Sequence, residues 1–582
     1  MKPIKRSTYS THTLMTWQGL NLWDAAALSL IISIIILIGF HTGQIAGKYQ
    51  LGQTIPIHLD PRYLPSYAAR TTIRLFVALL WSIIFTFIFG TWAAKNRNAS
   101  RLILPAIDVL QSVPILSFLS FAVSGFIMLF EGNMLGPEFA AIFGVFTSQV
   151  WNITLGFYQS LRGVPPELRE VGIIFHLSPW QRFWKIEVPS CMPSLIWNSM
   201  ISMSGSWFFV IACEAFSIAG TNITLPGIGS YIYLAISRAD TKAIYSAIVA
   251  MLLVILFYDQ LIFRPLIYWT ESFQEEDDGD SECPWVVELF RRGKMTHLLG
   301  TAMGWLANLW INCRLFNRRS PKRASNQFIT RWPTSFVLTT KVMGTTAILV
   351  TAGYISYLAC HYLSSEFTTK DVVPVLALGI FTGTRVMALV LIATIIWVPV
   401  GVWIGLRPRL VRLVQPILQF VAAFPANLLF PSLTILIITF KLNIEIWVSP
   451  LMILGTQWYI LFNVIAGVSQ LPKDLRFVAD NLQLTGWLWW KRLILPHIAP
   501  FLVTGIVTAA GGAWNASIIA EIVTWGDIRL QATGLGAYIQ NSFESGNTKQ
   551  LILGTIVMCL IVLLINRLVW QPLYNYIMEW FN

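Results

Sequence analysis

Charged residues are scarce in this chain. Asp, Glu, Lys and Arg make up only 12% of its 582 residues, whereas hydrophobic residues make up 55%. This balance excludes a water-soluble globular fold, which would have to expose large apolar patches. A polypeptide of this composition belongs in a lipid bilayer.

Familiar catalytic and metal-binding motifs are also missing. The six cysteines, at positions 191, 213, 283, 313, 360 and 559, show no paired spacing, so no disulfide or metal site is expected. No His-Glu-x-x-His, Gly-x-Ser-x-Gly or Gly-x-x-x-x-Gly-Lys-Ser/Thr pattern occurs; the segment "GQIAGKYQ" is too short for a phosphate-binding loop. We therefore predict no catalytic residues, no metal and no cofactor, and expect that the chain itself is not an enzyme.

Long apolar runs are abundant, and about twelve of them could each cross roughly 30 Å of hydrocarbon. They lie near residues 24–42, 74–94, 113–130, 138–160, 191–219, 243–263, 337–361, 385–406, 417–440, 446–468, 498–525 and 551–573. Their length predicts α-helices, because a strand of a membrane barrel needs only about ten residues of alternating pattern. The predicted fold class is an all-α, polytopic membrane protein.

The basic residues indicate the orientation of these spans. Most of the 40 Lys and Arg residues fall on one side if the N-terminus, with Lys2, Lys5 and Arg6, is cytoplasmic. This positive-inside bias predicts that both termini are cytoplasmic. The net charge of +12 is thus explained by membrane topology and contact with lipid, and no nucleic-acid partner is predicted. The first run lacks a small-residue cleavage site, so we interpret it as a retained helix and not as a signal peptide.

The chain contains an internal repeat. At an offset of 307 residues, without a gap, Trp151, Pro165, Arg169, Trp207 and Glu214 align with Trp458, Pro472, Arg476, Trp514 and Glu521. Upstream the offset becomes 311, which aligns Arg74 with Arg385. Both copies have six predicted spans in the same inside-outside sense, so they are parallel repeats about an axis along the membrane normal. Such a pair predicts one pathway between two halves.

The repeat divides the chain into a first six-span unit in residues 1–270, a linker in residues 271–335 and a second six-span unit in residues 336–582. The linker holds an acidic run, "QEEDDGDSE", a Trp-rich helical piece and a basic run, "RLFNRRSPKRAS". This composition is typical of a cytoplasmic connection with one interfacial amphipathic helix; a regulatory role is the alternative.

A charged loop occurs twice, in residues 161–190 and 469–497, between the fourth and fifth span of each unit. Its core reads "LREVGIIFHLSPWQRFWKIEVP" in the first copy and "LRFVADNLQLTGWLWWKRLILP" in the second. Pro near the start, Ser-Pro or Thr-Gly in the middle and Pro before the next span predict two short helices joined by a turn. A loop presented twice about a pseudo-two-fold axis suits a partner that is itself a two-fold dimer.

At this loop the sequence resembles the permease subunits of binding-protein-dependent ABC importers. That family has a Glu-Ala-Ala triplet here, followed four residues later by Gly. This chain has Glu170-Val171-Gly172 and Phe477-Val478-Ala479 at the triplet, and His176 and Gln483 at the Gly. Gly enters a left-handed backbone conformation at little cost, and these two residues do not. The flanking "PELRE", "LSPWQRF" and "PKDLR" are most similar to the branch associated with nitrate, sulfonate, taurine and bicarbonate, in which fused double permeases occur.

The resemblance implies a transport subunit of the bacterial plasma (inner) membrane. ATP would be hydrolysed by two separate ATP-binding cassette subunits, and a periplasmic or lipid-anchored binding protein would deliver a small solute such as nitrate, sulfonate, taurine or bicarbonate. The first short helix of each loop would couple to an ATPase subunit. The residues expected at these contacts are Glu167, Arg169, Glu170, Gly172, His176, Asp474, Arg476, Ala479 and Gln483.

Candidates for the translocation pathway come from polar residues within the spans. Glu214 and Glu521 are ionisable groups in membrane segments, where a charge costs at least a few kcal/mol. Trp207 and Trp514 lie two turns earlier on the same helix faces. The alternative is structural, with each Glu bonded to a neighbouring helix and each Trp packed.

Arg74 and Arg385 are further pathway candidates, at the predicted outer ends of equivalent spans. Two guanidinium groups on opposite sides of a pseudo-two-fold axis could attract an anion. Snorkelling to the lipid head groups is the alternative.

A secondary transporter can also have six plus six spans and is the alternative function. It would need buried ion relays, but this chain has few acids within its spans. The major facilitator loop pattern Gly-x-x-x-Asp-Arg-x-Gly-Arg-Arg is also absent after the second span, where "GTWAAKNRNASR" stands. A membrane-embedded enzyme would need a nucleophile with a base or a metal cluster. The sequence therefore favours the permease component of an ABC importer.

Overall fold

The computed structural model describes residues 56–112, 122–123, 125–218, 221–271, 283–292, 300–301, 304–305, 308–309, 311–312, 367–423, 426–525, 528–570, 572–573 and 576. The predicted spans near 24–42 and 337–361 lie outside these residues, as do residues 113–121 of the third predicted span. Within the described part of the chain, the structure is helical apart from two short β-hairpins, which agrees with the predicted all-α class.

The first half consists of three groups of elements. One long helix combines η1 (Pro61–Tyr63), α2 (Leu64–Phe85), η2 (Thr86–Gly90) and α3 (Thr91–Lys95). The central group is α4 (Arg97–Ser112), α6 (Leu135–Arg162), α7 (Pro166–Ile174), α8 (Pro179–Arg182), η3 (Phe183–Glu187) and α9 (Val188–Glu214). The last group is β1 (Ala215–Ile218), β2 (Thr221–Thr224), α10 (Ile228–Ser237), α11 (Thr241–Tyr258), η4 (Asp259–Phe263) and α12 (Arg264–Glu271).

The second half follows the linker helix α13 (Trp285–Arg292). Its first helices are α16 (Thr369–Gly405), α17 (Pro408–Ala423), η5 (Ala426–Leu429), α18 (Phe430–Thr439), α19 (Ile444–Trp447), α20 (Pro450–Leu454) and α21 (Trp458–Ser469). Then come α22 (Lys473–Asn481), α23 (Gly486–Trp489), η6 (Trp490–Ile494), α24 (Leu495–Ala520), β3 (Ile522–Trp525), β4 (Ile528–Gln531), α25 (Leu535–Glu544), α26 (Thr548–Ile565) and η7 (Asn566–Trp570).

The repeat in the sequence is a repeat in the structure. From α7 to η4, every element begins and ends 307 residues before its counterpart, except that α24 ends one residue early. The antiparallel hairpins have the same register, with Ala215 opposite Thr224 and Ile522 opposite Gln531. Local sequence therefore determines these boundaries in both halves in the same way.

Seven described helices are long and apolar enough to cross a membrane, and an eighth is counted if the bent pair Ile444–Leu454 and Trp458–Ser469, which meet at 42°, is one span. Together with the segments outside the described residues, this agrees with the prediction of about twelve spans. Large apolar side chains such as Leu391, Ile392 and Ile395 are more than half exposed on α16, as expected of a surface that faces lipid.

Some predicted boundaries were wrong. The spans near 74–94 and 385–406 begin earlier, at Leu64 and Thr369, so Arg74 and Arg385 lie inside helices and not at their outer ends. The predicted spans began too late because polar residues were taken as the ends of the apolar runs. The side chains of these polar residues form hydrogen bonds inside the protein. The spans predicted near 417–440 and 446–468 are each divided, because Pro431 lies in the first turn of α18 and Pro450 begins α20.

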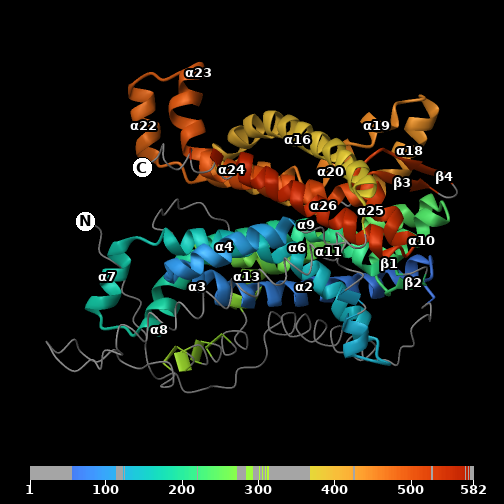
Figure 1. Cartoon of the computed structure of the whole chain (residues 1–582). Helices are drawn as coiled ribbons and strands as arrows, with labels where there is room; N and C mark the ends of the chain where they lie inside the picture. The colour runs from blue at the N-terminus through green and yellow to red at the C-terminus, as the bar shows by residue number, and fades with distance from the viewer. Residues whose placement is uncertain are drawn as a thin grey trace, which may run out of the picture.

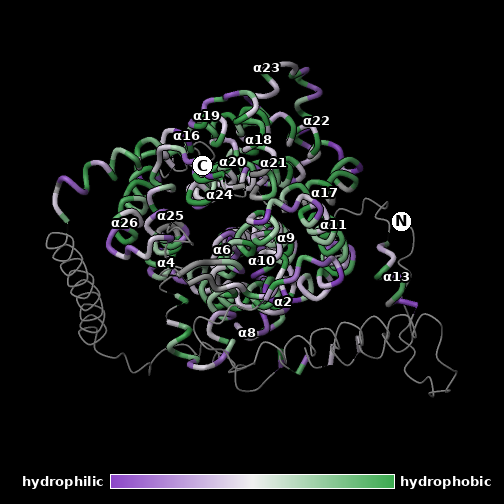
Figure 2. Tube along the Cα trace, turned by 90° about the vertical axis from the view of Figure 1, so that its right-hand side faces the viewer, coloured by the Kyte–Doolittle hydropathy of each residue, from purple (hydrophilic) through white to green (hydrophobic). Residues whose placement is uncertain are grey.

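The two halves lie side by side with their equivalent ends together. The loop helices α7, α8, α22 and α23 lie at one end of the bundle, and the two hairpins lie at the other (Figure 1). Two helices cross between the halves. α4 of the first half packs against α24 and α26 of the second, and α17 of the second packs against α9 and α11 of the first (Figure 2). This exchange makes one continuous bundle.

Candidate functional site

The two loop helices have the predicted structure. α7 and α22 each begin after a Pro, and each ends in the same hydrogen-bonded turn. The N–H of Leu177 donates to the carbonyl of Gly172 at 3.0 Å, and the N–H of Leu484 donates to that of Ala479 at 3.0 Å. This is the Schellman ending of a helix, in which the residue after the cap adopts a left-handed conformation.

That left-handed residue is not Gly in either half. His176 has φ 52° and Gln483 has φ 50°. The turn that the family's Gly would make is therefore formed by two residues that enter it at a conformational cost. The same geometry in both copies shows that the surrounding chain, and not the residue type, determines this turn.

Apart from Arg169 and Arg476, the residues predicted to contact an ATPase divide into two groups. Glu167, Glu170, His176, Asp474 and Gln483 are exposed. Gly172 and Ala479 are instead buried under their helices. A Cβ on Gly172 would lie 3.0 Å from the Ile186 side chain and 3.1 Å from that of Arg182, so Gly172 lets the first loop pack closely.

Arg169 and Arg476 have an internal partner that sequence reasoning did not foresee. Arg169 Nη2 donates to the Leu161 carbonyl at 3.1 Å, and Arg476 Nη2 donates to the Val468 carbonyl at 3.4 Å. Each Arg thus ties its loop helix to the end of the preceding span. Arg169 is also exposed, so it remains accessible to a partner.

An ion cluster behind the first loop was missed. Glu187 is 5% exposed and pairs with Lys95 at 2.6 Å and with Arg182 at 3.5 Å. Lys95 Nζ also lies 4.6 Å from the centre of the Phe183 ring. At the equivalent positions the second half has Leu406, Ile494 and Trp489. The sequence contained a signal for this cluster, because all three charged residues of the first half are replaced together by apolar residues in the second half.

A second ion cluster lies at the hairpin end of the first half. Arg74 donates from Nε and Nη2 to the Glu138 carboxylate at 2.6 and 2.7 Å, and from Nη1 to Glu214 at 2.6 Å. The Thr71 hydroxyl and the Gly229 N–H complete the contacts of Glu214, at 2.7 and 2.6 Å. No member of the Arg–Glu–Glu set is more than 1% exposed. The cluster ties α2, α6, α9 and α10 together, because buried charges need such partners.

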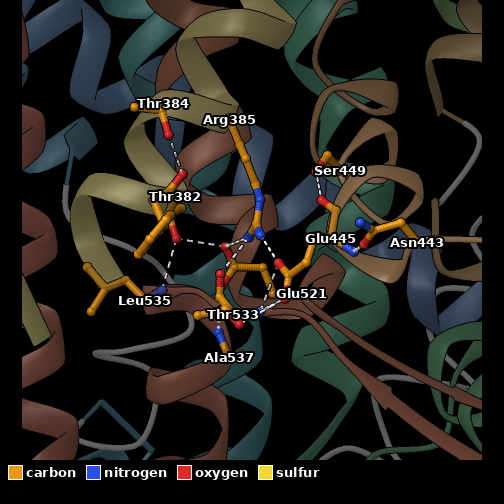
Figure 3. Close-up of polar contacts among 11 residues, drawn as sticks. Thr382, Thr384, Arg385, Asn443, Glu445, Ser449, Glu521, Thr533, Leu535 and Ala537 are labelled. Carbon is orange, nitrogen blue, oxygen red and sulfur yellow. Dashed lines mark hydrogen bonds and ion pairs between the residues drawn. The ribbon is translucent and has the colours of Figure 1, made fainter. Parts of the chain in front are cut away.

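The second half contains the corresponding cluster, drawn in Figure 3. Arg385 pairs with Glu445 and lies 3.5 Å from Glu521, and it also donates to the Thr533 carbonyl at 2.7 Å. Thr382 donates to Glu521 at 2.7 Å, as Thr71 does to Glu214. Arg385 is 15% and Glu445 37% exposed, so this cluster is more open to solvent.

The structure also explains two glycines of the repeat. A Cβ at Gly227 would collide with the Glu214 carboxylate, and one at Gly534 would collide with the Glu521 carboxylate.

Sequence reasoning missed Glu138 and Glu445 as members of the clusters. The repeat in the sequence could have revealed them, because Glu138 and Glu445 are separated by the repeat offset of 307 residues.

A cavity of about 90 Å³ lies between the halves. Trp514 lines it, whereas Trp207, Arg74, Arg385, Glu214 and Glu521 do not. Glu214 and Glu521 are fully buried and hydrogen-bonded to neighbouring helices, and Arg74 does not reach the surface as a snorkelling side chain would. Among the described residues, no group of three His, Cys, Asp or Glu side chains could hold a metal ion. The pathway roles of these six residues stay predictions.

The two tryptophans have different surroundings. The Trp207 indole N–H donates to the Tyr258 hydroxyl at 3.2 Å. The residue equivalent to Tyr258 in the second half is Ile565, which lines the cavity together with Trp514. The second half therefore lacks the hydroxyl group that accepts a hydrogen bond from the Trp207 indole in the first half.

Comparison with known proteins relates this arrangement to one family. The sequence profile of the binding-protein-dependent transport system inner membrane component matches residues 86–263 and again residues 397–571. These two segments contain both loop helices, both hairpins and the helices that line the cavity.

Individual relatives are similar over shorter stretches. A bicarbonate transport system permease protein of Synechococcus elongatus is 31% identical over 186 residues, which is 32% of this chain and 64% of the relative. A nitrate import permease protein of Leptolyngbya laminosa is 29% identical over 185 residues, 32% of this chain and 63% of the relative. A glycine betaine/carnitine transport permease protein of Listeria monocytogenes is 25% identical over 172 residues, which is 30% of this chain and 56% of the relative. The chain thus spans less than two thirds of the length of each.

Proposed function

Because the chain belongs to the family of binding-protein-dependent transport system inner membrane components, we propose that it is the complete membrane pathway of an ABC importer. Two family segments in one chain supply both halves of the bundle. The observation that carries the proposal is the pair α7 and α22, two matching helices that project at the same end of the molecule (Figure 1).

The exposed surface of these helices suits a protein partner. In the first loop Ile173, Ile174 and Phe175 are 61–72% exposed. In the second loop Phe477, Val478 and Leu482 are 51–65% exposed. Apolar side chains of this size at the end of a charged loop favour burial in the groove of a partner. We assign that partner as two ATP-binding cassette subunits, one for each loop, on the cytoplasmic side of the bacterial inner membrane.

The opposite end, which carries the hairpins, then faces outward. A binding protein would deliver solute there, and both chain termini would be cytoplasmic. The bicarbonate and nitrate permeases among the relatives favour a small oxyanion as the solute. The betaine permease among them makes a larger zwitterion the second candidate.

The test is reconstitution. We expect the purified chain alone to hydrolyse no ATP, and we expect hydrolysis and uptake of labelled bicarbonate or nitrate only with the ATPase and binding-protein partners. Native mass spectrometry should find one copy of this chain with two ATPase subunits. Robust hydrolysis by the isolated chain, or a minimal working unit with two copies of it, would refute the proposal.

A further inference from the structure

The cavity between the halves has a mainly apolar lining, and its polar residues carry no charge. Its hydroxyl and amide lining comes from both halves, with Thr147, Ser148 and Asn152 on α6 and Thr456, Tyr459 and Thr508 in the second half. No Lys, Arg, His, Asp or Glu is among the described residues that line it. An anion there would depend on hydrogen-bond donors alone.

Most hydroxyl protons in the lining are already bonded. Thr147 donates to the Gly144 carbonyl at 2.8 Å, Ser148 to that of Val145 at 2.6 Å, and Thr508 to that of Thr504 at 2.8 Å. These bonds are the usual ones between a hydroxyl and the preceding helical turn. Such hydroxyls offer only lone pairs to a solute.

Two donors on buried residues of the lining are different. The Tyr459 hydroxyl and the Trp514 indole N–H have no hydrogen-bond partner within the described part of the chain. Yet Tyr459 is only 8% exposed and Trp514 only 2%. Buried polar groups are normally bonded, so each of these donors is available to a water molecule or a solute that enters the cavity.

The comparison of the two halves explains why Trp514 is unpaired. Its counterpart Trp207 donates to Tyr258, but Ile565 stands at the equivalent position beside Trp514. Tyr459 replaces Asn152 of the first half, whose amide is bonded to the Ser202 hydroxyl at 3.1 Å. Gly205 allows the close approach, because a Cβ there would collide with the Tyr459 hydroxyl. Both of these buried donors thus belong to the second half.

Aromatic side chains line the cavity on the side of the hairpins. Phe208 and Phe209 are 6% and 7% exposed and pack across the interface with Ala516, Leu454 and Ile519. Ile519 lies one turn nearer the hairpins than the last residue of α24 that lines the cavity, Ala516. We infer that this apolar contact is the barrier to a solute that arrives from the hairpin end.

We propose that Tyr459 and Trp514 form a binding site that a small planar oxyanion occupies on its way through the pathway; this inference rests on the permease function proposed above. The two donors satisfy the solute oxygens in a site shielded from water, where hydrogen bonds to an anion are strong. The lack of a cationic side chain keeps binding weak enough for release. A cavity of about 90 Å³ is smaller than the roughly 150 Å³ that hold benzene. Nitrate and bicarbonate are smaller than benzene and glycine betaine is larger, so this volume favours the two oxyanions.

The main experiment measures solute transported per ATP hydrolysed, at saturating labelled nitrate or bicarbonate, in vesicles that contain the chain and its partners. We expect Tyr459→Phe and Trp514→Phe each to lower this ratio about tenfold, as for the loss of one hydrogen bond to a charged group. Matched controls are Tyr245→Phe and Trp81→Phe, which make the same chemical changes on surfaces 66% and 53% exposed. ATPase binding should stay as in the wild type.

A reciprocal variant tests the role of the missing acceptor. Ile565→Tyr restores in the second half the hydroxyl that Tyr258 supplies in the first, so it should occupy the Trp514 N–H. We expect Ile565→Tyr to lower the transport ratio more than Ile565→Phe, which adds similar bulk without a hydroxyl. Equal effects of the two variants would contradict an indole donor.

A measurement without partners separates this site from the proposed function. Nitrate should raise the unfolding temperature of the purified chain more than chloride at equal ionic strength, since a ligand stabilises the state that binds it. The Tyr459→Phe/Trp514→Phe double variant should lose this difference. If the wild type transports nitrate or bicarbonate but the variants match their controls in both assays, the permease function stands and the site is wrong. If the wild type transports glycine betaine and neither oxyanion, both the site and its proposed solute are overturned.

Discussion

The two halves hold the same Arg–Glu–Glu cluster in different surroundings. Arg74 and Glu138 are each 1% exposed, whereas Arg385 and Glu445 are 15% and 37% exposed. Glu138 lies in the first turn of α6, a continuous helix of 28 residues. Glu445 lies in the four-residue helix α19, because the equivalent helix of the second half is broken into α19, α20 and α21. Helix continuity, and not residue identity, therefore determines whether the cluster is sealed from solvent.

The opposite contrast occurs at the loop end. There the backbone elements of the two halves match residue for residue, but Lys95, Arg182 and Glu187 are replaced by Leu406, Trp489 and Ile494. An ion cluster and an apolar cluster thus support the same loop geometry, in line with the small net difference between buried ion pairs and well-packed apolar groups. The loop can change its chemistry without changing its shape.

The largest effect is expected where burial differs most. Glu138→Gln leaves Arg74 with one carboxylate in a sealed site, so we expect a loss of about 3 kcal/mol in the free energy of unfolding. Glu445→Gln, in the more open cluster, should cost less than about 1 kcal/mol. Denaturant unfolding of the purified proteins in detergent measures both. Equal losses would show that exposure does not distinguish the clusters.

A second difference concerns closure of the cavity. Phe208 and Phe209 of the first half face Ala516, while the residues equivalent to them are Asn515 and Ala516. The Phe208→Ala/Phe209→Ala variant should therefore raise passive nitrate flux through chain-containing vesicles about tenfold, because an apolar constriction excludes hydrated ions. Asn515→Ala should change flux far less. A double variant as tight as the wild type would place the barrier elsewhere.

The loop arginines test whether the two partner contacts are equivalent. An Arg at the protein surface contributes no more than about 1 kcal/mol to a contact. Arg169 is exposed and Arg476 partly exposed, so Arg169→Glu and Arg476→Glu alone should be mild and the double variant clearly worse in ATPase co-purification and uptake. The first loop keeps Glu170 where the second has Phe477, so its contact should weaken more in high salt. Full docking and uptake by the double variant would mean that these residues serve only their internal carbonyl bonds.

The smallest effect is expected where the halves agree. His176 and Gln483 both occupy the left-handed position, with φ 52° and 50°. Replacing either by Gly should stabilise the protein by about 0.5 kcal/mol, since the conformational cost is partly offset by the greater entropy of Gly in the unfolded chain. Thermal unfolding of the two single variants should give similar shifts. Destabilisation in only one half would show that its side chain makes a contact the other lacks.

Much of the fold was predictable from local sequence. Apolar runs, prolines and the repeat predicted the helical class, the doubled loop and the positions of α7 and α22, because these depend on residues close together in the chain. The failures fell where distant side chains decide the outcome. α2 and α16 extend beyond their predicted limits over polar residues such as Thr71 and Thr382, which bond to Glu214 at the end of α9 and to Glu521 just after α24.

The sequence by itself therefore determined which segments are helices, how the halves correspond and which residues are paired in the repeat. Only the tertiary structure decided what those pairs do. Trp207 and Trp514 occupy equivalent positions of the repeat, yet one indole is bonded to Tyr258 and the other faces a cavity beside Ile565, a residue on a different helix. A hydrogen bond depends on the group that packing brings within about 3 Å, and that neighbour is distant in the chain, where helical periodicity carries no information about it.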